Sequence, residues 1–323
     1  MNRVNTAKFS LIVFAVGAAV MAFAHWFNVD YLYFASYTIL QFIVLATAWN
    51  ILGGYCGYVN FGSAAFFAMG AYSTVFLHKF FGQLLPLPLL IVIGGLVSGI
   101  VGLGMGYLTL RLRGAFFAIA TLALAVVLAT LVTNWDFVGG SRGAYIIRPE
   151  SLEFAGITIN YIEYLFALML GLAMIALITA RTIERSQLGY GFATIRDDEL
   201  AAEACGVPTL RLKLIATTLS GAFMGMAGAP FPYYIGYLQP QSAFGLEYAV
   251  NSIAMPMIGG TTSWVGPLVG AILLGSAQQY ATVTISSAVN LLIVGLMLVG
   301  FVIIAPNGIV GLVQDRLRAR RKP

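Results

Sequence analysis

Ionisable side chains are scarce in this chain, and the segment 181–213, RTIERSQLGYGFATIRDDELAAEACGVPTLRLK, holds a large share of them. It carries five of the twelve acidic residues, namely Glu184, Asp197, Asp198, Glu199 and Glu203. Five cations accompany these acids: Arg181, Arg185, Arg196, Arg211 and Lys213. Carboxylates in such a segment can cap a helix, favour the positive end of its dipole and bind the cations of a partner. No catalytic residue is predicted.

The segment predicts one short helix that has its own start and stop signals. Thr194 is the expected N-cap, and Asp197 three residues later completes a pair that resembles a capping box. Gly206 is placed to end the helix, and Pro208 prevents it from resuming. About ten helical residues span only about 15 Å, which is too short to cross a bilayer.

Two interpretations of this helix remain open at this point. It can be part of a solvated loop that joins two membrane spans. Alternatively, it is a docking element for a soluble partner, because two caps, a patch of carboxylates and an alanine face exceed what a linker needs. The residues assigned to this element are Thr194, Ile195, Arg196, Asp197, Asp198, Glu199, Ala201, Ala202, Ala204 and Gly206.

The composition indicates that the rest of the chain lies in a membrane. Of 323 residues, 60% are hydrophobic and only 9% are charged, and the mean hydropathy is +0.90. A soluble domain of this size with this composition would have to expose a largely apolar surface to water, which soluble proteins do not do. The net charge of +5 does not indicate nucleic-acid binding, because the cations are scattered between spans or gathered at the end. The two cysteines, both expected near the cytoplasmic side, predict neither a structural disulfide nor a metal site.

We therefore expect an all-α polytopic membrane protein with about ten transmembrane or partly broken helices and both ends in the cytoplasm. Residues 1–323 form one transmembrane domain, with a cytoplasmic loop at 181–213, an outer loop at 134–160 and a basic tail at 312–323. The predicted spans run over about 9–27, 31–52, 57–72, 86–110, 114–133, 161–180, 213–234, 246–260, 265–281 and 288–304. The first span is expected to be retained, although Ala22-Phe-Ala24 resembles a signal-peptide cleavage site.

Counting cations sets the orientation. Ten crossings place fourteen of the seventeen cations on one side, and only Lys79, Arg142 and Arg148 on the other. Cytoplasmic loops carry the excess of Lys and Arg, so the 181–213 loop is expected to face the cytoplasm. The fourteen are Arg3, Lys8, Arg111, Arg113, Arg181, Arg185, Arg196, Arg211, Lys213, Arg316, Arg318, Arg320, Arg321 and Lys322.

Polar residues and glycines interrupt some of the spans and are candidates for a solute path. The simpler interpretation is close helix packing through small residues, which is common in membrane proteins. The functional interpretation is that they border a route for solute at membrane depth. The candidate path residues are Asn60, Gly62, Ser63, Gly70, Thr121, Asn251, Gly259 and Gly260.

The outer loop begins with NWDFVGGSRGAYIIRP, which combines interfacial aromatic residues with turn glycines. Free N–H groups of such turns can hold an anion. An ordinary surface turn and contact with an external protein are the other interpretations. The residues assigned to this site are Trp135, Gly139, Gly140, Arg142 and Gly143.

The sequence shows no motif by which this chain could itself supply energy for the movement of a solute. It has no Gly-Lys pair and therefore no P-loop of the G-x-x-x-x-G-K-[ST] type. Ion-coupled carriers keep ionisable groups near the bilayer midplane, whereas Glu163 and Glu247 fall near the outer ends of spans. The remaining interpretation is a membrane pathway driven by another chain through the cytoplasmic loop.

Several motifs resemble the permeases of branched-chain amino acid ABC importers. They are GYVNFGSAAFFAMGAY (57–72), TLALA with NWDFVGGSRG, TIRDDELAAEACGVPTLRLKLIA and SIAMPMIGGTTSWVGPLVGA, and the resemblance runs from about Ala35 to Gly311. It implies that Ile195 to Gly206 form the coupling helix that contacts an ATPase subunit. It further implies two ATPase subunits that bind the ATP, a second related permease, a periplasmic solute-binding protein and the bacterial inner membrane. No cofactor in this chain and no nucleic acid are implied.

One motif departs from the family pattern. Residues 59–63 read Val-Asn-Phe-Gly-Ser where Leu-Ser-Leu-Gly-His is more usual, so the solute need not be leucine, isoleucine or valine. The resemblance thus predicts a permease subunit for branched-chain or related amino acids. An ion-coupled secondary carrier for a small polar solute is the alternative.

Overall fold

The structure is a computed structural model that describes residues 6–27, 29–109, 111–112, 114–149, 151–154, 157–284, 289–304 and 308–312. Each of the ten predicted spans overlaps one long helix among the described residues, and the all-α polytopic fold is confirmed; the third helix, however, starts at Ser63 instead of at residue 57 and continues past residue 72 to Phe81. These helices are α1 (Thr6–Phe27), α2 (Asp30–Asn50), α3 (Ser63–Phe81), α4 (Leu87–Thr109), α5 (Ala115–Thr133), α6 (Tyr161–Glu184), α9 (Thr209–Gly228), α12 (Leu246–Gly259), α13 (Val265–Thr284) and α14 (Val289–Ile304).

Six of the described helical segments are long and apolar enough to cross a bilayer. They begin at Thr6, Asp30, Leu87, Ala115, Tyr161 and Thr209. Helix α12 is shorter, and it continues through Pro256. It ends where Gly260 adopts a φ of +115°, a conformation that favours glycine.

Short elements connect these helices. The π-helix η1 (Ile51–Tyr55) extends α2, and the 3₁₀ turns η2 (Gly82–Leu84), η3 (Asp136–Val138) and η4 (Gly140–Arg142) lie in loops. Strand β1 (Ala144–Tyr145) pairs with β4 (Tyr237–Leu238), and β2 (Ser151–Phe154) pairs with β3 (Ile157–Asn160), both antiparallel. The remaining short helices are α7 (Gln187–Asp197), α8 (Glu199–Ala204), α10 (Phe231–Ile235) and α11 (Pro240–Ala243).

Helix α9 lies at the centre of one half of the bundle and packs against α3 and α4. Glycines permit this close approach: a Cβ atom placed on Gly225 would lie 2.6 Å from the carbonyl oxygen of Gly94 in α4. Ser98 Oγ donates a hydrogen bond of 2.8 Å to the carbonyl of Phe66, which joins α4 to α3. Small residues that let helix backbones meet are typical of packing inside a bilayer.

Helix α2 is central to the other half. Every residue from Gln41 to Asn50 is buried, and the helix packs against α6, α13, α12 and α9. Because α9 contacts both α2 and the α3–α4 pair, any displacement of α9 affects both halves of the bundle.

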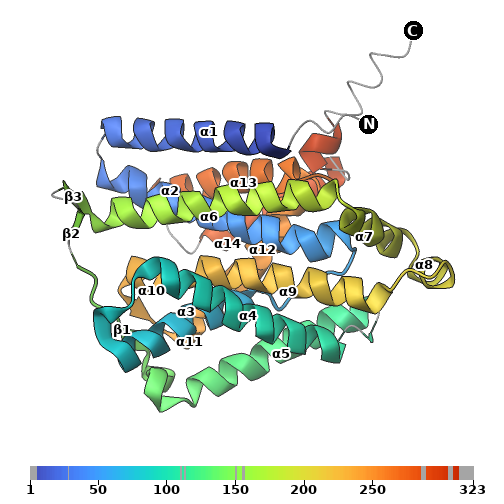
Figure 1. Ribbon diagram of the computed structural model, residues 1–323, viewed down its shortest axis with the longest axis horizontal. Coiled ribbons are helices and arrows are strands. Elements are labelled where there is room, and N and C mark those ends of the chain that lie inside the picture. The colour runs from blue at the N-terminus through green and yellow to red at the C-terminus, as the bar shows by residue number, and fades with distance from the viewer. Residues whose placement is uncertain are drawn as a thin grey trace, which may run out of the picture.

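Figure 1 shows two distinct ends of this bundle. The first turn of α1 lies at the same end as α7 and α8, whereas β1, β2 and β3 lie at the opposite end. The 181–213 loop and the 134–160 loop therefore lie at opposite ends of the bundle. Arg3, Arg113 and, from residue 313 onward, the predicted basic tail lie outside the described residues.

Candidate functional site

The 181–213 loop contains two helices rather than the single helix that the sequence predicted. Helix α7 starts after Ser186, whose Oγ accepts the Gly189 N–H at 3.4 Å. Helix α8 starts after Asp198, whose carboxylate accepts the Ala201 N–H at 3.1 Å. Asp198 has an extended backbone (φ −159°, ψ 108°), which breaks the helical path between the two.

The predicted N-cap was therefore wrong. Thr194 lies inside α7, and its Oγ1 donates to the carbonyl of Gly191 at 2.8 Å. Asp197 is the last residue of α7 and forms no capping box. Asp198 is the N-cap instead. Its extended backbone allows its side chain to accept the N–H of the residue three positions later.

The predicted end of the helix at Gly206 is confirmed. Gly206 has a φ of +81°, its N–H donates to Glu203 O at 2.9 Å, and the Val207 N–H donates to Ala202 O at 3.0 Å. These two bonds form a Schellman motif, which satisfies the last carbonyls of the helix. Helix α8 is thus held at both ends in only six residues.

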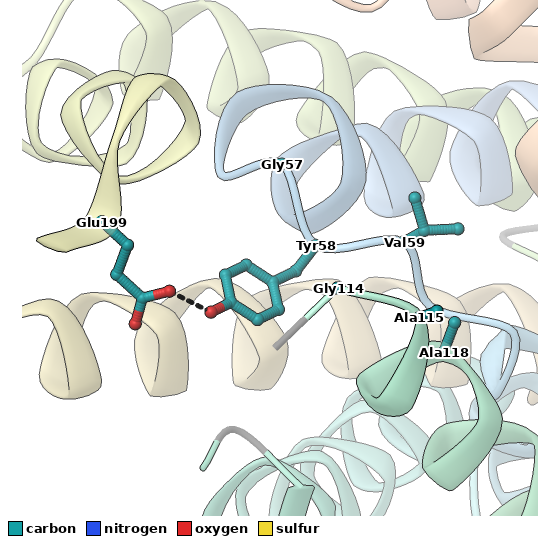
Figure 2. A pocket seen from close by; sticks show the side chains of 7 residues that line it. All are labelled: Gly57, Tyr58, Val59, Gly114, Ala115, Ala118 and Glu199. Atoms are coloured by element: carbon teal, nitrogen blue, oxygen red, sulfur yellow. Dashed lines mark hydrogen bonds between the residues drawn. The ribbon is translucent and has the colours of Figure 1, made fainter. Parts of the chain in front are cut away.

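A buried ion pair joins α8 to the membrane helices. Lys213 Nζ in α9 lies 2.7 Å from Glu199 Oε1, and the two side chains are only 4% and 12% exposed. Tyr58, in the segment before α3, donates its hydroxyl proton to Glu199 and accepts a 3.2 Å hydrogen bond from Lys213. Figure 2 shows the carboxylate of Glu199 directed at the Tyr58 hydroxyl. One carboxylate therefore connects the loop to both α9 and the start of α3.

Helix α7 is attached at a second point. Arg196 Nη1 donates to the carbonyl of Gly54 in η1 at 3.4 Å. Gly57 has a φ of +80°, and a Cβ at this position would lie 2.9 Å from Arg196 Cγ. The backbone after η1 consequently approaches α7 closely only because residue 57 is glycine.

Glu184, the last residue of α6, closes the same end of the bundle. Its Oε2 accepts the backbone N–H of Trp264 at 2.8 Å and the Tyr55 hydroxyl at 3.5 Å. The loop before α13, the end of η1 and α6 thus meet at one carboxylate. The sequence indicated Glu184 only as part of an acidic patch. In the structure its hydrogen-bond partners are Trp264 and Tyr55 of the same chain.

A cavity of about 360 Å³ opens beside Glu199. Its walls come from the segment before α3, the start of α5 and α8 (Figure 2). The lining residues are Gly57, Tyr58, Val59, Gly114, Ala115, Ala118 and Glu199. The cavity lies between the start of α5 and α8.

The predicted docking residues divide into two groups. Ile195 and Ala202 are buried against the chain itself, and Glu199 points inward to Lys213. The outward-facing residues are Thr194, Arg196, Asp197, Asp198, Ala201, Ala204 and Gly206. Sequence reasoning missed three large apolar side chains that are exposed around them: Tyr190, Leu200 and Leu210. The sequence feature that could have identified such residues is a large apolar residue in a polar segment, as Leu200 is between Glu199 and the alanines.

Four of the candidate path residues come together. Asn60, Gly62 and Ser63 precede or begin α3, and the Phe61 N–H donates to Thr121 Oγ1 of α5 at 3.2 Å. Asn60 Oδ1 accepts the Gly62 N–H at 2.7 Å. Within the part of the chain that the structure describes, Asn60 Nδ2 and Ser63 Oγ are buried and have no hydrogen-bond partner. Buried polar groups of this kind require an explanation, and a bound solute is one.

The other candidate path residues lie elsewhere. Gly70 packs against the Gly225 backbone of α9, and Gly259 packs against the Gly266 backbone of α13. Gly260 is the C-cap of α12. Asn251 Oδ1 accepts a 2.8 Å hydrogen bond from Gln278 of α13, which links the two helices.

The outer-loop glycines adopt tight turns, as predicted, but their N–H groups are occupied. Gly139, Gly140 and Gly143 donate to the carbonyls of Asp136, Trp135 and Gly140, respectively, at 3.0–3.3 Å. The suggested anion nest is therefore wrong, because these turns satisfy their own donors. Trp135 and Arg142 are exposed beside them, which leaves the protein-contact interpretation in place.

Both cysteines are free thiols, and their environments differ. Cys205 is exposed at the end of α8. Cys56 is buried beside the Glu199–Lys213 pair, and burial raises the pKa of its thiol to about 12. The thiolate is the reactive form, so Cys56 is not suited to react near neutral pH, whereas Cys205 is accessible to reagents.

The chain is similar to known transport proteins over most of its length. The family described as branched-chain amino acid transport system, permease component, matches residues 31–302. The high-affinity branched-chain amino acid transport system permease protein LivM of Salmonella typhimurium is 27% identical, with 98% of this chain and 78% of that protein aligned. LivM of Escherichia coli is 28% identical over 86% of this chain and 70% of that protein.

A more distant similarity joins an archaeal protein. The probable branched-chain amino acid transport permease protein LivH of Methanocaldococcus jannaschii is 24% identical, over 80% of this chain and 85% of that protein. No solved structure matches this chain.

Proposed function

This chain belongs to the family of permease components of branched-chain amino acid transport systems, and on that premise we propose that it is the transmembrane subunit of an ATP-binding cassette importer for branched-chain or related amino acids. It is a multi-pass membrane protein, and the bacterial inner membrane is its proposed location. The ion-coupled carrier that the sequence left open is set aside, because this family is the permease type.

The observation that carries the proposal is the attachment of α8. A short helix transmits force only if it is rigid and joined to what it moves. Helix α8 is capped at both ends, and Glu199 connects it to Lys213 in α9 and to Tyr58 before α3. A push on the exposed face of the loop is therefore passed directly to α9 and to the segment that leads into α3.

The outward surface of the loop is suited to an ATPase subunit. Asp197, Asp198 and Leu200 are all exposed on this loop, so it presents carboxylates and a large apolar side chain together. An apolar centre with a charged rim is the usual anatomy of a protein interface. The partners are two ATP-binding subunits, a second related permease and a periplasmic binding protein, the last of which contacts the region of Trp135 and Arg142. ATP is bound by the ATPase subunits and not by this chain.

The mechanism follows from these attachments. Closure of the ATPase dimer on ATP moves α8, and the Glu199–Lys213 pair carries the displacement into α9. Because α9 packs on α3 and α4 through glycines, the three helices move together. The path near Asn60, Ser63 and Thr121 then opens outward to accept solute. The substrate class is an amino acid with a branched or otherwise small apolar side chain.

Reconstitution tests the proposal. Proteoliposomes that contain the two permeases, the ATPases and the binding protein should take up labelled leucine or a related amino acid only with ATP inside. A matched sample with an ATPase unable to hydrolyse ATP should show none. Uptake by this chain without any nucleotide-hydrolysing subunit would overturn the proposal.

A further inference from the structure

The groove between α1 and the rest of the bundle has a composition that suits a lipid tail. It has a volume of about 440 Å³, within the range of about 300–1,000 Å³ typical of ligand pockets. Helices α1, α2, α6 and α13 form its walls, and Ser36 is the only polar side chain among its lining residues. Most of its lining residues belong to α1, α2 and α6, three of the helices that are long and apolar enough to cross a bilayer, so it lies at membrane depth.

Helix α1 covers this groove and contacts α6 near each of its two ends. At one end, His25 Nδ1 lies 3.0 Å from Glu163 Oε1 of α6. At the other end, the Arg181 guanidinium lies over the Phe9 ring, 3.6 Å from its centroid. Figure 1 shows α1 at the edge of the bundle, beside α2 and α6. Between its ends α1 is mostly exposed, so a tail can enter from the surrounding bilayer.

The end of the groove near α7 carries positive charge. Arg181 lies there, and Arg185 and Glu184 are the charged groups that act on it. Lys8 precedes Phe9 on α1 and is exposed. Glu184 is committed to Trp264 and Tyr55, and among the described residues no ion pair includes Lys8, Arg181 or Arg185. Three cations therefore lie at the headgroup end of the groove. The carboxylate near them, Glu184, is already hydrogen-bonded within the chain.

We propose that this groove binds one anionic phospholipid of the cytoplasmic leaflet, with an acyl chain between α1 and α13 and its phosphate on Arg181 and Arg185. Basic pockets between spanning helices on the cytoplasmic side are suited to anionic headgroups. Arginine also favours phosphate because its planar donors match the phosphate oxygens. At this end of the groove, the part of the acyl chain nearest the headgroup contacts Phe9, Leu177 and Trp264.

Trp264 provides an internal probe of occupancy, because it lines the groove and its ring packs edge-on against Phe9 with centroids 4.9 Å apart. The assembled transporter is placed in nanodiscs that contain either phosphatidylglycerol or phosphatidylcholine brominated near the top of one acyl chain. Bromine quenches a nearby tryptophan. Subtracting the signal of Trp264→Phe from that of the wild type isolates the quenching of Trp264.

Phosphatidylglycerol should quench Trp264 at a lower mole fraction than phosphatidylcholine. Removing one cation should weaken the preference roughly fivefold, and Arg181→Gln with Arg185→Gln should abolish it. Arg111→Gln, which removes a cation away from the groove, should leave it unchanged. Co-purification of the ATPases with each variant confirms that it has folded.

Three results would overturn the proposal. Equal quenching by the two lipids would mean unselective contact with bulk lipid. A preference that survives the double substitution would place the headgroup elsewhere. Absence of quenching in the assembled transporter, with quenching in the isolated chain, would mean that the second permease covers the groove.

Discussion

Glu199 and Lys213 are fourteen positions apart in the chain, yet their charged atoms lie 2.7 Å from each other. Both side chains are almost fully removed from solvent, and Tyr58 contacts both. At this contact the 181–213 loop is joined to α9 and to the segment before α3. It makes Lys213 a positioning residue for the loop, although the sequence treated it only as one of the flanking cations.

Breaking this pair should disconnect α8 from α9. Lys213→Met leaves the Glu199 carboxylate buried without its cation, and Glu199→Lys puts two ammonium groups together; removing one partner of a buried pair costs roughly 3–5 kcal/mol. We expect ATP-dependent uptake to fall to background while membrane insertion continues. Uptake and ATPase content of the purified complex measure this.

The exchange of the two charges in one chain, Glu199→Lys with Lys213→Glu, is the matched control and should restore part of the uptake. A Glu199→Lys transporter with normal ATPase content and normal uptake would refute the role of the pair.

Leu200 should be required for assembly but not for folding. Its side chain is 64% exposed on α8, so Leu200→Asp removes an apolar contact from the proposed ATPase interface without changing the interior. Truncating a central apolar contact of an interface costs about 2 kcal/mol or more. ATPase recovered with the purified permease should drop strongly, with unchanged thermal stability of the permease. Leu84→Asp, at an exposed site in η2 at the other end of α3, should retain normal ATPase content.

The two cysteines should report the topology of the loop. A membrane-impermeant maleimide should modify Cys205 only from the cytoplasmic side, and bound ATPase should slow this reaction. Cys56 should remain unmodified up to pH 9: its raised pKa of about 12 means that the thiolate appears only at higher pH, and burial blocks access as well. Comparing Cys56→Ser with Cys205→Ser assigns the signal. Labelling of Cys205 from outside would invert the proposed orientation.

Asn60 offers a test of the solute path that separates structure from transport. Its Oδ1 is needed by the Gly62 N–H, whereas its Nδ2 has no partner in the described residues. Asn60→Asp keeps the acceptor and removes the donor, while Asn60→Leu removes both. If the amide contacts solute, both variants should lose uptake, with assembly retained in Asn60→Asp. Normal uptake by Asn60→Leu would exclude Asn60 from the path.

Much of the architecture could be predicted because its causes are local. A run of about twenty apolar residues must become a helix in a bilayer, where each backbone N–H and carbonyl needs an internal partner. For that reason each predicted span overlaps one long helix of the structure, although α3 is displaced toward the C-terminus of its predicted span. The end of α8 at Gly206 was predictable for a similar reason, because glycine adopts the left-handed conformation at little cost.

The connections inside the site depended on contacts between distant segments. Thr194 and Asp198 are both acceptable caps in sequence, and the choice between them was made by where α7 packs against η1 and α8 against α9. Likewise, a list of charges does not indicate which carboxylate turns inward. By itself, the sequence determined which residues enter the bilayer and where the polar loop lies. Only the tertiary structure decided that Glu199 meets Lys213 and Tyr58, because ion pairing requires side chains to be brought within a few ångströms by packing.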